Sequence, residues 1–215
     1  MKQYQLVIFD WDGTLMDSIA RIISSVQQLA MSENLALPNE DAIKGIIGLS
    51  LDEALTTLFP NADSHDVEQL KRGYKKHYVD LDPTPAPIYD YAHQLLSGLK
   101  NRGKFLAVAT GKAREGLHRV WQEAALCDYF DSSRCGCECT SKPHPDMIEQ
   151  LLEEFNIAPE NAVMIGDSIL DMEMAKRAGV DSIGVTHGVH EREKLSLYSP
   201  TAIVNSLQEI EELIN

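Results

Sequence analysis

Short apolar runs recur along the chain and alternate with segments in which apolar residues return every three or four positions. The first run, Tyr4–Phe9, is rich in β-branched and aromatic residues and ends abruptly at Asp10. A run of this kind predicts a buried strand that breaks into a loop. Similar runs predict four more strands, at Phe105–Ala109, Ala162–Ile165, Ser182–Val185 and Thr201–Val204.

Helical periodicity fills the intervals between the later strands. It predicts helices at Tyr89–Asn101, Arg114–Ala125, Asp146–Phe155, Leu170–Ala178 and Leu207–Ile214. Strands that alternate with helices indicate an α/β fold, a doubly wound, Rossmann-like core around a parallel sheet. Ligands bind such sheets at the carboxyl ends of the strands, so we expect a functional site there.

One long interval departs from the alternation and contains only helical patterns. These lie at Ile19–Met31, near Asp41–Gly48, at Leu51–Phe59 and at Asp63–Tyr78. Prolines then crowd the segment Asp82–Pro87, which predicts a stiff return connection. We therefore expect a small α-helical cap domain, residues 16–82, inserted into an α/β catalytic core made of residues 1–15 and 83–215.

The composition is that of an ordinary globular protein, with 44% hydrophobic and 24% charged residues and no low-complexity segment. The longest apolar runs, such as Leu6–Phe9, are far too short to cross a bilayer. The first residues lack the small-residue cleavage site of a signal peptide. These features predict a cytoplasmic protein with no membrane partner.

The excess of acidic residues disfavours some classes of binding partner. The formal net charge is −14, from 33 acidic and 19 basic residues, and a surface of this kind disfavours both nucleic acid and anionic membranes. An anionic small-molecule substrate would need a divalent cation and a few well-placed Lys or Arg residues. The sequence leaves monomer and homodimer open.

Three of the four cysteines are crowded at Cys135, Cys137 and Cys139. Their alternation predicts a strand or hairpin with the three thiols on one face. Tight Cys-X-Cys is not the usual zinc spacing, which favours free structural thiols. A metal or redox site completed by Cys127 or His144 is the alternative.

Two carboxylates, Asp10 and Asp12, follow the first predicted strand. Such a pair is costly to bury unless it binds a cation or shares a task. An aspartate at a strand end is well placed to attack phosphorus and form an aspartyl phosphate. Gly13 lets the chain turn so that backbone amides can face a phosphate. An ordinary acidic turn would give the same residues.

Three further segments carry candidate groups near predicted strand ends or helix starts. The Thr110 hydroxyl and the next backbone amide, of Gly111, could hold a phosphoryl oxygen. Lys142, followed by a proline, could neutralise a nucleophile and a phosphoryl group. Asp167, in a segment that also contains Asp171, suits a hard cation. Taken singly, each segment is also explained by loop or helix-capping chemistry.

In this order the four segments resemble the haloacid dehalogenase-like superfamily of phosphohydrolases, and most closely its phosphoglycolate phosphatase-like branch. The resemblance covers essentially the whole chain. It implies that Asp10 is the nucleophile and that Asp12 protonates the leaving oxygen and then activates water. Thr110 and Lys142 look like phosphate binders, with Lys142 also balancing the charge of Asp10.

The same resemblance implies a Mg²⁺ cofactor. Its ligands would be the Asp10 carboxylate, the Asp12 backbone carbonyl and Asp167, with Asp171 supporting the site from outside the ligands. The backbone amides of Gly13 and Gly111, together with Thr14, complete the expected phosphate site. Gly111 departs from the more usual Ser/Thr-Asn-Lys pattern, but only a side chain is lost.

The implied reaction is hydrolysis of a small-molecule phosphate monoester, such as a phosphoglycolate-like compound, a sugar phosphate or a nucleotide monophosphate. Asp12 separates the chain from haloacid dehalogenases, which lack a second aspartate in this segment. A phosphomutase of the β-phosphoglucomutase type is an alternative, although Thr14 stands where such mutases more often carry valine. A non-catalytic protein that binds a phosphorylated ligand is the third possibility.

Substrate choice is expected to lie in the cap. The segment Gly45–Ser50 is a candidate loop facing the site. Arg72 and Lys76 would share a helix face and could meet a substrate carboxylate or second phosphate, although a solvated basic face fits them equally. Lys112 and Arg114 are second candidates, near the expected phosphate.

Overall fold

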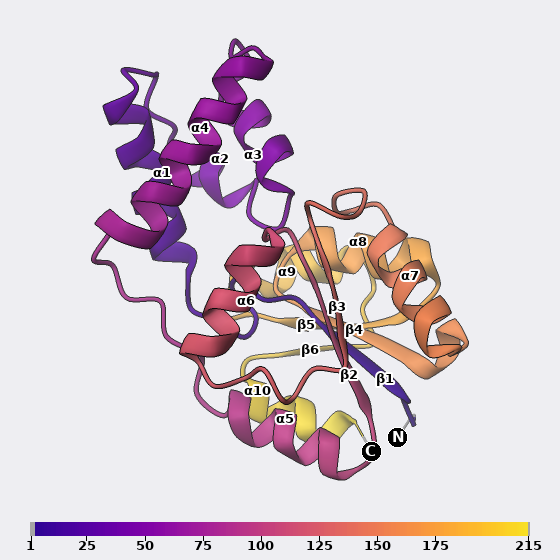
Figure 1. The fold of residues 1–215 in the computed structure, drawn as a ribbon. Coiled ribbons are helices and arrows are strands. Elements are labelled where there is room, and N and C mark those ends of the chain that lie inside the picture. Colours follow the sequence, from indigo (N-terminus) through magenta and orange to yellow (C-terminus); the bar gives the residue numbers. More distant parts are fainter. Residues whose placement is uncertain (1–2, 215) are drawn as a thin grey trace.

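A six-stranded parallel sheet forms the centre of the protein in a computed structural model that describes residues 3–214 (Figure 1). Every strand pair is parallel, and the order is β3-β2-β1-β4-β5-β6. The strands are β1 (Leu6–Phe9), β2 (Phe105–Thr110), β3 (Ser132–Cys135), β4 (Ala162–Gly166), β5 (Asp181–Val185) and β6 (Ala202–Val204). The predicted α/β fold is confirmed. The ends of the predicted core, residues 1–2 and 215, lie outside the described residues.

The central strand β1 is apolar throughout because both of its faces are buried. Val7 and Phe9 enter one hydrophobic cluster, and Leu6 and Ile8 enter the other. A strand covered on both faces needs a continuous apolar run rather than an alternating one. This is the pattern that made β1 visible in the sequence.

Helices cover the two faces of the sheet (Figure 1). Residues of α5 (Ala92–Asn101), α6 (Arg114–Glu123) and α10 (Leu207–Leu213) join the cluster of Val7. Residues of α7 (Asp146–Phe155) and α8 (Ile169–Ala178) join the cluster of Leu6. A 3₁₀ turn (Pro159–Asn161) precedes β4, and the short helix α9 (Arg192–Ser196) contacts β5 and β6.

The first four helices after β1 form a separate layer beyond the sheet (Figure 1). They are α1 (Ile19–Ser32), α2 (Glu40–Lys44), α3 (Leu51–Leu58) and α4 (Ser64–Lys76), and α4 runs into a π-helical segment, His77–Leu81. These helices, called the cap helices below, have hydrophobic clusters of their own. The chain leaves and returns side by side, because the Asp17 N–H donates to the Pro87 carbonyl at 2.8 Å and Met16 pairs with Ile88.

The sequence did not reveal β3 or α9, and one local prediction is wrong. The cysteine trio does not form a hairpin with three thiols on one face. Cys135 ends β3 and is buried, whereas Cys137 is exposed in a turn closed by the Glu138 N–H, which donates to the Cys135 carbonyl at 3.0 Å. None of the four cysteines, Cys127, Cys135, Cys137 and Cys139, forms a disulfide within the described residues.

None of the helices in residues 3–214 combines the length and the apolar character that crossing a bilayer requires.

Candidate active site

The first carboxylates lie where β1 ends. The Asp10 N–H donates to the Ile165 carbonyl at 2.9 Å, which extends the pairing with β4 as far as the site. The chain then turns sharply, because the Trp11 carbonyl accepts from the N–H groups of Leu15 and Met16. Asp10 is 2% exposed and Asp12 is 8% exposed, so both carboxylates are largely removed from bulk water.

A buried lysine joins two carboxylates from different parts of the chain. Lys142 Nζ lies 2.7 Å from Asp10 Oδ1 and 2.6 Å from Asp171 Oδ1. Burial alone would lower the pKa of Lys142, but the negative charges of Asp10 and Asp171 outweigh it and raise the pKa above its ordinary value. Lys142 therefore stays cationic and neutralises Asp10. Within the described residues, no hydrogen bond reaches the second oxygen of Asp10, Oδ2.

Asp171 positions this lysine. Its Oδ2 accepts hydrogen bonds from the Ser168 N–H at 3.1 Å and the Ser168 hydroxyl at 2.7 Å. The Asp171 N–H donates back to the Ser168 hydroxyl at 3.3 Å, which completes a capping box at the start of α8. Both carboxylate oxygens of Asp171 are therefore engaged by protein donors. The helix start fixes Asp171, and Asp171 in turn fixes Lys142.

Asp167 lies against the loop that follows β1. Its Oδ1 accepts from the Thr14 hydroxyl at 2.9 Å, and its Oδ2 accepts from the Val189 N–H at 2.6 Å. The loop approaches so closely that a Cβ on Gly13 would lie 2.3 Å from Asp167 Oδ2, and Gly13 has φ +80°. Only glycine meets both conditions.

The carboxylates of Asp10, Asp167 and Asp171 form a compact acidic cluster, with one oxygen of each lying within 4.8 Å of the others. Burial, and then the neighbouring Asp171 charge, raise the pKa of Asp167 to about 7. Burial likewise raises the pKa of Asp10 well above its ordinary value despite the charge of Lys142. A divalent cation with oxygen ligands would relieve this crowding, so the donor set fits such an ion. Among the residues that the structure describes, this is the one group of three or more potential metal ligands, and it contains no cysteine.

Asp12 is held by two donors that sequence reasoning did not assign to it. The Ser18 hydroxyl donates to Asp12 Oδ1 at 2.5 Å, and Lys112 Nζ donates to the same oxygen at 2.8 Å. Lys112 Nζ also lies 4.8 Å from the centroid of the Tyr78 ring. The Asp12 charge raises the pKa of Lys112 although burial opposes it. Ser18 belongs to the same sequence segment as Asp12, but nothing local indicated the lysine.

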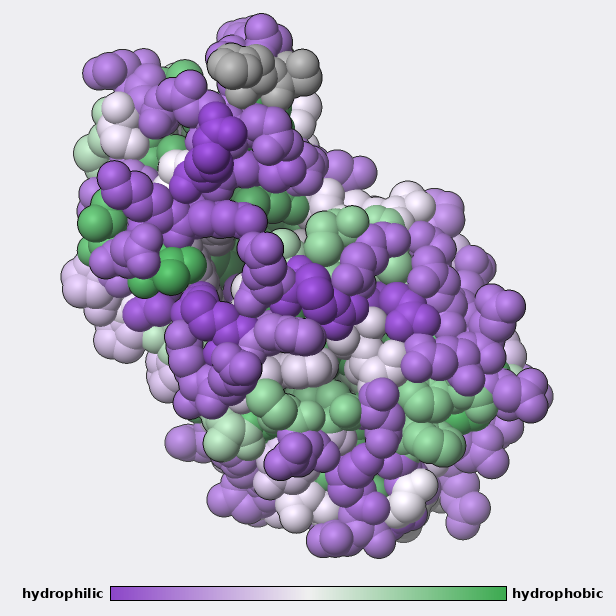
Figure 2. All heavy atoms as spheres, viewed as in Figure 1, coloured by the Kyte–Doolittle hydropathy of each residue, from purple (hydrophilic) through white to green (hydrophobic). Residues whose placement is uncertain are grey.

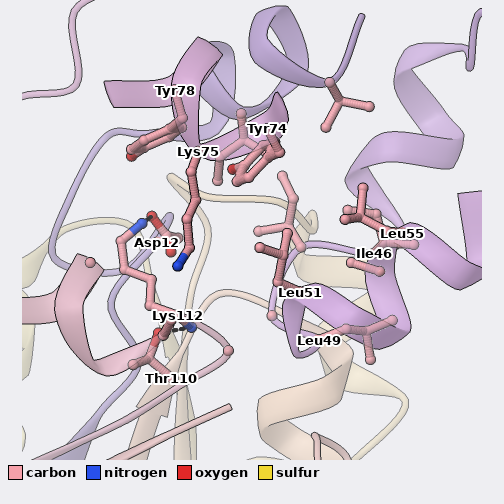
Figure 3. Close-up of a pocket in the computed structure, with 18 of the residues that line it drawn as sticks. Asp12, Ile46, Leu49, Leu51, Leu55, Tyr74, Lys75, Tyr78, Thr110 and Lys112 are labelled. Carbon is pink, nitrogen blue, oxygen red and sulfur yellow. Dashed lines mark hydrogen bonds and ion pairs between the residues drawn. The ribbon is translucent and has the colours of Figure 1, made fainter. Parts of the chain in front are cut away.

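A cavity of about 280 Å³ opens above these groups, between the core and the cap helices (Figure 3). Asp10, Asp12 and Thr110 line it from the core side, and side chains of α1, α3 and α4 line it from the cap side. The Thr110 hydroxyl accepts a hydrogen bond from the Lys112 N–H at 3.2 Å. The nucleophile candidate and the phosphate-binding candidate therefore share one cavity.

The structure brings some of the sequence candidates to this cavity and leaves others outside it. Thr110 and Gly111 line it, together with the loop residues 46–49. Gly13 and Thr14 are not among the lining residues. The Gly13 N–H donates to the Met16 carbonyl at 2.8 Å, and the Thr14 hydroxyl is bonded to Asp167.

The two cap residues proposed from the sequence, Arg72 and Lys76, are absent from the cavity lining. Lys75 points into it instead (Figure 3). Successive helical residues are turned by about 100°, so Lys76 lies on a different face of α4 from Lys75. Arg114 is engaged elsewhere, in an ion pair with Glu138.

A family model, curated relatives and a solved structure all match this chain over most of its length. A family model described as haloacid dehalogenase-like hydrolase matches residues 7–185. The protein named Probable phosphatase IndB of Dickeya dadantii (strain 3937) is 32% identical over 212 residues, which cover 95% of this chain and 91% of that protein. A phosphoglycolate phosphatase of Nitrosococcus oceani is 28% identical, over 100% of this chain and 98% of that protein. A crystal structure described as a predicted phosphatase from Clostridium acetobutylicum superposes with a TM-score of 0.85 at 28% identity, covering 99% of this chain and 98% of that one.

Proposed function

The chain belongs to the haloacid dehalogenase-like hydrolase family, and from that membership we propose that it is a magnesium-dependent phosphatase that forms an aspartyl phosphate on Asp10. The substrate is a small-molecule phosphate monoester. The observation that carries the proposal is the buried ion pair of Asp10 with Lys142, 2.7 Å apart. Asp10 lines the cavity together with Asp12, and Lys142 lies behind Asp10, outside the lining.

In the first step, an Asp10 carboxylate oxygen attacks phosphorus and the ester P–O bond breaks. Asp12 gives its proton to the leaving oxygen, and the products are an alcohol and an aspartyl phosphate. The hydrogen bonds from Ser18 and Lys112 engage Asp12 Oδ1, so we assign the proton transfer to Oδ2.

In the second step, Asp12 takes a proton from water, the water oxygen attacks phosphorus and the bond to Asp10 breaks. Lys142 balances the charge of Asp10 and of the phosphoryl group throughout, since phosphoryl transfer depends mainly on positioning and charge neutralisation. The Thr110 hydroxyl and the Gly111 amide bind phosphoryl oxygens.

Asp10, Asp167 and the Asp12 backbone carbonyl would hold Mg²⁺, with Asp171 acting through Lys142. When bound, the ion would neutralise negative charge on the phosphoryl oxygens.

The two parts of the chain have different proposed roles. Catalysis lies in the core, residues 1–15 and 83–215, and substrate selection lies in the cap domain, residues 16–82. Contact between them shields the reacting groups from bulk water.

The proposal is tested by measuring phosphate release from a panel of metabolite phosphates, with magnesium and with a chelator. Activity should require the metal and should fall on the order of a thousandfold or more in Asp10→Asn, because the nucleophile is lost. Asp17→Asn, which changes an exposed aspartate of the same loop, is the matched control and should keep its activity.

Undiminished phosphate release by Asp10→Asn would refute the aspartyl phosphate. Turnover that appears only when a sugar bisphosphate is added would instead indicate the phosphomutase.

A further inference from the structure

The cap side of the active-site cavity is an apolar wall. The wall is made by residues of the loop before α3, of α3 itself and of the α4–π-helix segment: Ile47, Leu51, Leu55, Leu58, Tyr74 and Tyr78. Figure 3 shows Leu51 and Leu55 of α3 and Tyr74 of α4 around the cavity. On the face drawn in Figure 2 the surface is mainly hydrophilic, and hydrophobic residues come to the surface in several patches, one of them in the hollow between the cap helices and the core.

The wall is continuous with the reacting groups. Asp10 and Asp12 line the same cavity as Leu51 and Leu55. A phosphoryl group held against Asp10 would direct its ester oxygen toward Asp12, and the rest of the substrate would extend toward the wall. The occupant of the wall is therefore the leaving group of the substrate.

The cations near the wall are already paired with carboxylates of the protein. Lys112 Nζ is 2.8 Å from Asp12 Oδ1, and Arg119 is 2.8 Å from Glu123 Oε1. The third cation of the lining, Lys75, lies 3.5 Å from Glu115 Oε2. Displacing Asp12 from Lys112 would leave a carboxylate that is only 11% exposed without its cation, which is unfavourable. Lys75 and Glu115 are 51% and 87% exposed, so Lys75 offers a charged leaving group only a weak, solvent-screened partner.

We propose that the substrate is the phosphate monoester of an apolar alcohol, with an uncharged alkyl or aryl leaving group rather than a glycolate-type acid. This inference rests on the proposed function, since the wall selects a leaving group only if Asp10 takes the phosphoryl group. It also separates this chain from its phosphoglycolate phosphatase relatives, which its core residues alone do not do.

The test is kcat/KM along a series of n-alkyl phosphates from ethyl to hexyl, with phosphoglycolate in the same assay. Leaving-group reactivity is nearly constant along the series, so the trend reports binding. Each methylene that enters the cavity should raise kcat/KM by about fourfold, and hexyl phosphate should exceed phosphoglycolate by about a hundredfold. A flat series with phosphoglycolate preferred would overturn the inference.

A charge placed in the wall gives a second test. Leu51→Lys should lower kcat/KM for hexyl phosphate by about tenfold or more and should raise it for phosphoglycolate, because it supplies an unpaired cation. Leu37→Lys makes the same change at a cap leucine that is 57% exposed and outside the cavity, and it should change neither value. Equal melting temperatures of the two variants show that both fold.

Binding of non-hydrolysable compounds separates the inference from the proposed reaction. Calorimetry with magnesium-loaded protein should show affinity rising from ethyl- to hexylphosphonate and remaining weak for phosphonoacetate. If these affinities rise but no ester is cleaved, the phosphatase proposal fails and the apolar site stands. If esters are cleaved but affinity does not follow chain length, the phosphatase stands and the apolar site fails.

Discussion

At Gly111 the backbone of the core runs directly against the backbone of the cap. A Cβ at this position would lie 2.1 Å from the Leu49 carbonyl oxygen and 2.6 Å from that of Gly48. From the sequence, the Gly111 amide was a candidate phosphate binder, and the glycine itself was a departure from the family pattern in which only a side chain is lost. The structure gives a physical reason for the departure, because any side chain here would collide with backbone that cannot rotate away.

Gly111→Ala should therefore push the cap loop off the core. We expect a loss of roughly 1–3 kcal/mol in the free energy of unfolding, as overpacking of a close contact usually gives, and a fall of about tenfold in kcat/KM. Urea unfolding and steady-state kinetics measure the two effects. Gly45→Ala is the control, since its Cβ would find the nearest atoms at an ordinary 3.4 Å; equal losses in the two variants would contradict the argument.

At the scale of elements, one core loop carries the buried Lys142 and also forms a hydrogen bond with the cap. Ser141 precedes Lys142, and its hydroxyl accepts a hydrogen bond from the Ser50 N–H at 2.8 Å. Ser50 is also the residue before α3, where its own hydroxyl accepts from the Glu53 N–H. This hydrogen bond therefore joins the start of α3 to the core loop whose Lys142 neutralises Asp10.

Ser141→Ala would leave the Ser50 N–H buried without its acceptor, a cost of about 1–3 kcal/mol against the present arrangement of cap and core. We expect KM to rise by about tenfold and amide hydrogen exchange in α3 to accelerate. Thr57→Ala, at an exposed site on α3, should leave both unchanged. Exchange in α3 that is identical in the Ser141 variant and the wild type would show that the contact does not hold the cap.

At the scale of the whole molecule, the acidic cluster links stability to pH and to the metal. The pKa of Asp167 is raised to about 7, by burial first and then by Asp171, and that of Asp10 is also raised. Without metal, the folded protein therefore binds more protons than the unfolded chain between about pH 4 and 7, and its free energy of unfolding falls as pH rises through this window.

We therefore expect magnesium to raise the melting temperature more at pH 8 than at pH 5, because the ion requires the ionised carboxylates. Without metal, the titration of Asp167 alone should lower the free energy of unfolding by roughly 2 to 4 kcal/mol as pH rises through this window. This contribution is measured as the difference between wild type and Asp167→Asn. The difference is needed because His190, whose pKa is lowered by burial, titrates in the same range with the opposite sign. A pH slope that is the same in both proteins would refute the assignment.

Much of this protein could be predicted from its sequence because the relevant signals are local. A strand buried on both faces must be a continuous apolar run, as Leu6–Phe9 is, and the helix Asp146–Phe155 was predicted with its observed bounds from periodicity alone. The order of four short segments indicated the hydrolase family and the phosphatase class, which the comparisons confirm. The domain boundaries and the roles of the site residues remain predictions.

The tertiary structure decided what depends on contacts between distant segments. The short edge strand Ser132–Cys135 has no apolar run to reveal it, and only its pairing with β2 makes it a strand. The rotation of α4 against the core brings Lys75 rather than Arg72 or Lys76 to the cavity. Lys112 contacts Asp12 because β1 and β2 are neighbours in the sheet, and Gly111 contacts Leu49 because cap and core pack together. Periodicity records which face of an element is buried, but the partner on that face is set by packing in three dimensions.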